Sequence, residues 1–367
     1  MRVALFSACL LLTCAAPATA AGLCAKIPGS TKVRACAESE HGLVIADSTA
    51  RAQELLDAAE AGAARFQRHF GRPASLFAVI ETNDGQVDGV ALDGLKSSGF
   101  KAVLPWLSPA GYRSQIEASV RRAVEAQTAN LPAEARESVL QQALAQVTGK
   151  SPVEGHETGA IAHELGHIWY IENFWPGREG RGGHYGGPGP DWMDETAAVL
   201  MESDALAAGR VKQFAERYAK LRAGGMLAKA PDNALVDLPA FFASSHPGVA
   251  RGEAMLKEIR KEGPGAAPKN GVLIRASSGP EAEKFAESAI HYYLQSTMAA
   301  EYLVARTGDL TVFARIGAAF ARGETIEQWL ANKEPKGKLP RDLKALQADW
   351  LDWLETRFPA TPAKQAA

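Results

Sequence analysis

The sequence lacks a large net charge of either sign and contains no internal repeat. Its 40 basic residues are nearly balanced by 42 acidic ones, which gives a formal charge of −2 at pH 7. So balanced a chain offers no broad attraction for nucleic acid or for an anionic membrane, and neither is expected as the main partner. Without a repeat or heptad array, the 367 residues are expected to form a globular body and not a solenoid.

Long hydrophobic runs are also missing, and the apolar run at the start of the chain is short. This run, at 3–12, follows Arg2 and precedes the small residues at 18–20. It is too short to span a bilayer, and its flanks are typical of a secretory signal peptide. We therefore expect residues 1–20 to be removed by cleavage after Ala20. The mature bacterial protein is then periplasmic or secreted, with no integral membrane segment.

Cysteine is scarce, since the chain has 4 cysteines and removal of the signal peptide leaves only Cys24 and Cys36. In an oxidising compartment these two are expected to form a disulfide that closes a short loop. The alternative is a thiolate metal site, but no histidine or further cysteine nearby could complete a tetrahedral zinc shell. A local disulfide is therefore the better interpretation.

What the sequence does contain is a mixed beginning followed by many helical patterns. Apolar residues at helical spacing over 48–70 end at Gly71, while 75–81 and 101–107 are rich in residues typical of strands. The pattern predicts an α+β protein, with a small N-terminal α/β part and a mainly helical C-terminal part. Further helices are expected at 112–147 with an interruption at 130–132, and at 157–174, 192–208, 211–223, 281–307, 310–321 and 341–358.

These elements divide into four expected regions after the signal peptide. Residues 21–150 form an N-terminal α/β region, 151–260 contain the next helices, 261–358 form a C-terminal helical region, and 359–367 form a disordered tail. Within the second region, 177–190 is rich in glycine and proline, so we expect a flexible loop on the surface or over a cleft.

One stretch of the expected helix 157–174 carries a metal-binding pattern. His163, Glu164 and His167 form an H-E-x-x-H sequence, in which the two histidines lie four residues apart on one helix face. Both imidazoles can therefore bind one zinc ion, while Glu164, turned about 100° away, can act on a water bound to that ion. A surface helix with two solvated histidines is the alternative, but the apolar residues around the motif argue against a solvated element.

A catalytic zinc ion needs a third protein ligand, and the sequence offers one on a second helix. Trp192, Glu195 and Ala198 form a W-x-x-E-x-x-A pattern at the start of that helix. Together with the H-E-x-x-H motif, this pattern resembles the gluzincin metallopeptidases, the group that contains thermolysin and the zinc aminopeptidases. The resemblance implies a zincin-like catalytic domain, with zinc-binding catalytic helices in 151–260. It also implies Glu195 as the third ligand of one Zn2+ ion per chain.

Two other residues near Glu195 are alternatives for the third ligand. Asp194 is adjacent to Glu195 on the same helix and so points about 100° away from it. His184 lies within the glycine-rich segment. A structural alternative is also open, because Asp194 and Glu195 near a helix N-terminus can stabilise the helix dipole without binding a metal.

The resemblance extends to the expected helix 281–307, since a tyrosine near the start of such a helix faces the zinc in many gluzincin-like domains. Tyr293 occupies that place and is the expected donor to the oxyanion that forms during hydrolysis, with His291 as the alternative. The two lie two residues apart, so one helix is not expected to turn both toward the zinc. A structural reading is also open, in which Tyr292 or Tyr293 belongs to the apolar core.

The expected function is therefore zinc-dependent hydrolysis of peptide bonds in a peptide or protein substrate. Glu164 would activate a zinc-bound water as general base, with no covalent enzyme intermediate. The sequence has no recognisable amine-anchoring motif near the site, which favours endopeptidase or oligopeptidase action. The alternative is a non-hydrolytic zinc-containing protein that binds a peptide or an envelope component. Glu164 favours the enzyme, because a binding protein needs no base there.

Overall fold

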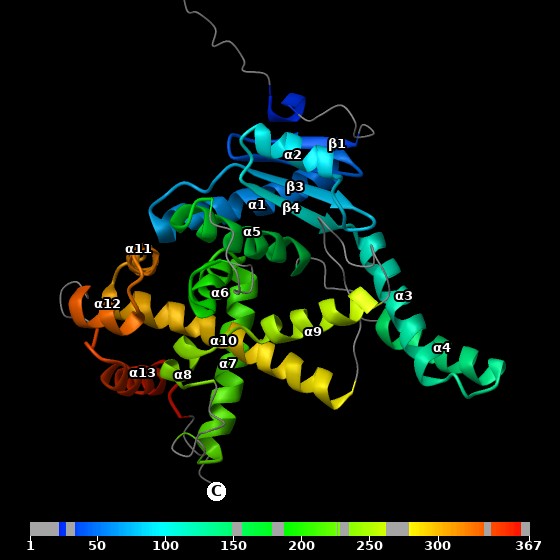
Figure 1. Ribbon diagram of the computed structural model, residues 1–367. Helices are drawn as coiled ribbons and strands as arrows, with labels where there is room; N and C mark the ends of the chain where they lie inside the picture. The colour runs from blue at the N-terminus through cyan, green and yellow to red at the C-terminus, as the bar shows by residue number, and fades with distance from the viewer. Residues whose placement is uncertain are drawn as a thin grey trace, which may run out of the picture.

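The computed structural model describes residues 22–26, 34–148, 156–177, 187–225, 227, 235–261, 279–333 and 339–360. The expected signal peptide at 1–20, the alternative ligand His184 and residues 361–367 of the expected tail lie outside these ranges. In the part of the chain that is described, no helix is both long enough and apolar enough to cross a membrane. The fold belongs to the predicted α+β class, with a small sheet followed by a mainly helical region (Figure 1).

The N-terminal part is a 4-stranded sheet whose strands lie in the order of the sequence. Strands β2 (Gly42–Ala46), β3 (Phe77–Thr82) and β4 (Ala102–Leu107) are parallel, and β1 (Ala35–Glu38) pairs antiparallel with β2 at one edge. Strands β3 and β4 are the two that the sequence predicted.

Helices cover both faces of this sheet. Successive residues of a strand point to opposite faces, so neighbouring residues of β2 contact different helices. Val44 belongs to the core shared with helix α1 (Thr49–Phe70), whereas Leu43 and Ile45 pack with helix α2 (Gly89–Ser97) on the other face (Figure 1). Burial on both faces is typical of parallel strands, and it explains why β2 is continuously apolar.

The disulfide expected from the sequence is confirmed. It joins Cys24, in the short helix η1 (Leu23–Lys26), to Cys36 in β1. The bond fastens η1 to the edge of the sheet, and it fits the oxidising compartment expected for the protein.

The helix predicted at 48–70 is α1, and it begins and ends with the expected residues. Ser48 caps its N-terminus by accepting a hydrogen bond from a backbone N–H of the first turn, and Gly71 ends it with a φ of 61°. After β4, helices α3 (Pro109–Gln127) and α4 (Ala133–Thr148) form a hairpin that projects from the rest of the molecule (Figure 1). The predicted interruption at 130–132 is the turn of this hairpin.

The remaining described chain is helical, and most of its helices share one hydrophobic core with α1 and the sheet. This common core extends from the sheet through the helices that carry the site, so the sheet and the helices hold the site jointly. The helices are α5 (His156–Phe174), α6 (Asp191–Val199), α7 (Asp204–Ala223), α8 (Leu238–Ala243), α9 (Pro247–Lys261), α10 (Pro280–Thr307), α11 (Val312–Ala321), α12 (Ile326–Lys333) and α13 (Leu343–Arg357).

One predicted helix boundary is wrong. The sequence pattern predicted a break at 209–210, whereas the break between α6 and α7 lies at 200–203. The reason is Ser203, whose side chain accepts a hydrogen bond from a backbone N–H in the first turn of α7 and so starts that helix early. Glu202 consequently lies in the connection between the two helices, where it can turn toward α5.

Candidate metal site

Two glycines let three helices approach closely around a buried polar site. Helix α1 lies against α5 at Gly62, where an added Cβ would come within 2.8 Å of the Cβ of Ala162. Helix α6 lies against α5 at Gly166, where an added Cβ would come within 2.9 Å of the Cα of Ala198. Since Gly166 stands inside the H-E-x-x-H motif, its missing side chain allows the acidic residues of α6 to reach the two histidines.

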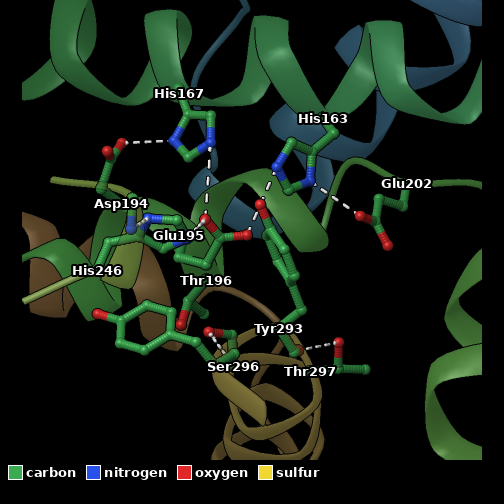
Figure 2. A network of polar contacts seen from close by, with 12 residues as sticks. His163, His167, Asp194, Glu195, Thr196, Glu202, His246, Tyr293, Ser296 and Thr297 are labelled. Carbon is green, nitrogen blue, oxygen red and sulfur yellow. Dashed lines mark hydrogen bonds and ion pairs between the residues drawn. The ribbon is translucent and has the colours of Figure 1, made fainter. Parts of the chain in front are cut away.

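His163, His167 and Glu195 meet where α5 and α6 touch (Figure 2). Nε2 of His163 lies 3.5 Å from Oε1 of Glu195, and Nε2 of His167 lies 3.9 Å from Oε2. Their side chains are 8%, 0% and 1% exposed, in that order. Each of the three residues offers one ligand atom, and these atoms lie within 4.8 Å of one another. The group can therefore hold one metal ion.

A carboxylate contacts the other ring nitrogen of each of these histidines. Nδ1 of His163 lies 2.8 Å from Oε1 of Glu202, and Nδ1 of His167 lies 3.0 Å from Oδ1 of Asp194. Such a carboxylate favours the proton on Nδ1 and directs the lone pair of Nε2 toward a metal ion. Asp194, an alternative ligand from the sequence, thus lies on the outer side of His167, while Glu195 lies at the centre.

The carboxylate of Glu195 passes a test for a metal ligand. It is 1% exposed, and neither of its oxygen atoms has a hydrogen-bond partner among the described residues. A buried carboxylate in this condition is costly, and a cation between it and the two imidazoles would remove the cost. Two imidazole nitrogens and one carboxylate oxygen are also the ligand set of one kind of open catalytic zinc site. The residues present therefore fit zinc.

The ionisation of the group points in the same direction. Burial lowers the pKa of His167, but Asp194 and Glu195 outweigh this effect and raise the pKa to about 9. Burial also disfavours a charge on His163, yet the carboxylates of Glu195 and Glu202 raise its pKa above the ordinary value. The pKa of Glu195 is raised by burial. Added positive charge is therefore favourable at the centre, whether a proton or a metal ion supplies it.

His246 is a further imidazole at this site. It lies between α8 and α9, and its Nε2 is 3.7 Å from Oε2 of Glu195. Its Nδ1 accepts a hydrogen bond from the backbone N–H of Gly248 at 3.0 Å. In neutral His246 the ring proton is consequently on Nε2, the nitrogen that faces Glu195. This tautomer is the opposite of that favoured in the two motif histidines, and it makes His246 a hydrogen-bond donor to the site.

Tyr293 of α10 reaches the same site. Its ring centre lies 5.8 Å from that of His163 and 5.7 Å from that of His246. Figure 2 shows the hydroxyl end of Tyr293 directed toward the space between His163 and Glu195. Burial, followed by the charge of Glu195, raises the pKa of this hydroxyl, so Tyr293 keeps its proton at neutral pH.

His291, the alternative to Tyr293, makes its contacts with other residues. Its Nε2 lies 3.0 Å from Oε1 of Glu287 and 2.8 Å from Nη1 of Arg217. Of the two residues that the sequence suggested as oxyanion donors, the structure brings Tyr293 to the metal-binding group and leaves His291 in a separate ion-pair cluster.

Arg210 of α7 lies on the outer side of the site. Its Nε donates to Oε2 of Glu202 at 2.7 Å, a second guanidinium nitrogen donates to Oε1, and its Cζ lies 4.7 Å from the ring centre of Tyr293. Burial would raise the pKa of Glu202, but its hydrogen bonds with His163 and Arg210 hold the pKa below the ordinary value. Glu202 therefore stays ionised beside the histidine that it orients.

Sequence reasoning missed Glu202, His246 and Arg210. A coordinating histidine often donates its second ring N–H to a carboxylate. The sequence contains 42 acidic residues, so this tendency alone does not show which of them contacts His163. His246 is one of only 8 histidines, which is a weak signal. Its place beside Glu195 depends on a tertiary contact, because its backbone N–H donates to the side chain of Asp191 at the start of α6.

Comparison with protein-family models, with curated proteins and with solved structures finds no match for this chain. What the structure establishes is a buried group of two histidines and one glutamate that can hold a metal ion, within an α+β fold.

Proposed function

We propose that this protein is a zinc-dependent metallopeptidase that acts on peptide or protein substrates. The observation that carries the proposal is the buried Glu195 carboxylate, which has no hydrogen-bond partner among the described residues and faces two imidazoles held by other carboxylates. His163, His167 and Glu195 would hold the ion. The resemblance of the two sequence motifs to the gluzincins supports the same three ligands.

Glu164 is the proposed general base. Zinc held in such a site supplies a Lewis acid and lowers the pKa of a coordinated water toward neutrality. Glu164 follows the first proposed ligand on α5 and is half-buried, and its charge contributes to raising the pKa of both motif histidines, which supports a role for it at the site. Its carboxylate would accept a proton from the attacking water and return that proton to the leaving amine.

Two proton-bearing groups are proposed to stabilise the negative charge that develops on the carbonyl oxygen. Tyr293 contributes its hydroxyl, which burial keeps protonated. His246 contributes its Nε2–H, which follows from the hydrogen bond that its Nδ1 accepts. Groups fixed before the reaction in a poorly hydrated site are effective for this purpose, because they need little reorganisation as the charge forms.

The test is a measurement of metal content and of cleavage on the same purified protein. After zinc loading and dialysis, elemental analysis should give about one zinc ion per chain. A mixed peptide library should be cleaved, a chelator should stop cleavage, and added zinc should restore it. The cleavage positions then distinguish endopeptidase from exopeptidase action. Zinc binding and peptide binding without cleavage would instead support the non-hydrolytic alternative, and a protein that binds no zinc would contradict both.

A further inference from the structure

Arg210 contacts two different parts of the proposed site with one planar group. It donates through two nitrogens to Glu202, and Glu202 in turn contacts Nδ1 of His163 at 2.8 Å. The same guanidinium lies over the ring of Tyr293, 4.7 Å from its centre. The metal ligand and the proposed oxyanion donor therefore share one support, although they come from α5 and α10.

The contact with Glu202 is of a kind that fixes geometry. The side chain of Glu202 is 1% exposed and that of Arg210 is 16% exposed, so water competes little for these hydrogen bonds. A guanidinium that forms two parallel hydrogen bonds holds a carboxylate in one plane. Glu202 can then present Oε1 to His163 in only one orientation. This contact fixes the orientation of the His163 imidazole ring.

The contact with Tyr293 fixes a second group. A guanidinium over the face of a phenol ring is attracted by the ring quadrupole, and the attraction strengthens when both are partly removed from water. A tyrosine side chain has two rotatable bonds, so a planar cation against one face of the Tyr293 ring restricts where its hydroxyl can lie.

We propose that Arg210 is a positioning residue that couples the metal ligand His163 to the oxyanion donor Tyr293. It acts on the metal through Glu202 and on the substrate through the ring of Tyr293. This inference rests on the proposed function for its second half only, because the effect on metal affinity needs no substrate.

Lysine cannot replace arginine in both contacts. A lysine ammonium keeps the charge beside Glu202, but it lacks the planar fork and the flat surface that stacks on a ring. Arg210→Lys should therefore retain more metal affinity than Arg210→Gln, yet lose the coupling to Tyr293. The two variants thus separate the charge of Arg210 from its shape.

Arg217 provides the matched control. It lies two turns further along α7, and it also pairs with residues of α10, since its guanidinium contacts Glu287 and His291. Arg217→Gln removes one arginine and one α7–α10 contact without touching the metal-binding group. An effect on the site that came only from weakened helix packing should appear in this variant as well.

The first experiment measures metal affinity by competition between the protein and a chelator, with zinc or cobalt as the probe. Loss of a residue that supports a ligand typically costs 10-fold to 100-fold in affinity, and we expect a loss of about this size for Arg210→Gln. The visible spectrum of the cobalt-loaded protein should shift, because it reports the geometry of the ligands. Arg217→Gln should match the wild type in both. Since Glu202 transmits the effect, Glu202→Gln combined with Arg210→Gln should be little worse than Glu202→Gln alone.

The second experiment is a double-mutant cycle on kcat with a peptide that the wild type cleaves. If Arg210 positions Tyr293, then Tyr293→Phe should reduce kcat far less in the Arg210→Lys background than in the wild type, with little change in KM. Additive effects would overturn the coupling to Tyr293. Wild-type metal affinity in a folded Arg210→Gln protein, with reduced affinity in Glu202→Gln, would overturn the coupling to His163. Should Arg210→Gln not fold, Arg210→Lys replaces it: a shifted cobalt spectrum supports the coupling to His163, because lysine lacks the planar fork, and a spectrum and metal affinity equal to the wild type overturn it.

The outcomes also separate this inference from the proposed function. A wild type that binds zinc but cleaves no peptide contradicts the peptidase, while the metal-affinity measurements still decide whether Arg210 supports His163. A wild type that binds no metal overturns both. A wild type that binds zinc and cleaves peptides, together with an Arg210→Gln variant indistinguishable from the Arg217 control, overturns the inference and leaves the peptidase in place.

Discussion

Asp194 and Glu195 are adjacent in the sequence and face the two different nitrogens of one imidazole: Oδ1 of Asp194 lies 3.0 Å from Nδ1 of His167, whereas Oε2 of Glu195 lies 3.9 Å from Nε2 of the same ring. A step of about 100° around the helix separates the two carboxylates. As a result, Glu195 of α6 faces the centre of the site, and its neighbour Asp194 supports the proposed ligand His167 from outside.

This difference predicts an order of metal affinities. Glu195→Ala removes a proposed ligand and should abolish most zinc binding. Asp194→Ala removes a supporting contact and should weaken zinc binding by a factor on the order of 10 to 100. Competition with a chelator measures both, and the reverse order would transfer the ligand role to Asp194.

His246 should be needed for cleavage and dispensable for metal binding. In the neutral ring its proton is on Nε2, so this nitrogen could donate to a group in the site and would not be free to coordinate an ion. His246→Phe should therefore keep zinc affinity near the wild-type value and lower kcat by about 100-fold or more, the scale reported for loss of one oxyanion donor. His291→Phe is the control and should change kcat little. A large loss of zinc in the His246 variant would instead make this residue a ligand.

Gly166 should control the contact between α5 and α6. In Gly166→Ala the new Cβ would approach the Cα of Ala198 to 2.9 Å, so the helices must separate. We expect a loss of about 1–3 kcal/mol in the free energy of unfolding, the usual cost of overpacking, together with weaker zinc binding. Urea unfolding of the metal-free protein measures the first effect.

Gly209 supplies the control for that substitution. It lies inside α7, and an added Cβ there would meet nothing within 4 Å. Gly209→Ala should therefore stabilise the protein by about 0.5–1 kcal/mol, because alanine loses less backbone freedom than glycine in a helix. Equal effects of the two substitutions would show that close contact at Gly166 does not hold the site together.

Much of the candidate metal site could be predicted because its parts are local. The spacing of His163 and His167 places both on one face of a helix whatever the tertiary fold. Glu195 was found through a second local pattern and a family resemblance, and the disulfide between Cys24 and Cys36 followed from the scarcity of cysteine. Each of these predictions needed only short segments of chain.

The remaining residues of the site depend on contacts that no local pattern contains. His246 reaches Glu195 from a segment between α8 and α9. The sequence pattern predicted neither of these helices, so it gave no reason to place His246 near the site. Glu202 faces His163 only because Ser203 starts α7 earlier than the apolar pattern indicated. Arg210 lies in α7, 8 residues after Glu202, and nothing in the surrounding sequence distinguishes it from the other arginines.

The most direct test of the account is Glu164→Gln, because glutamine keeps the size of the side chain and removes the base. The substitution should leave one zinc ion bound and peptide affinity intact, since the three proposed ligands are unchanged. Cleavage of a peptide that the wild type cuts should fall by a factor on the order of 100 or more, the usual scale for loss of a general base. Zinc-loaded Glu164→Gln that cleaves the same peptide at the wild-type rate would contradict the proposed mechanism.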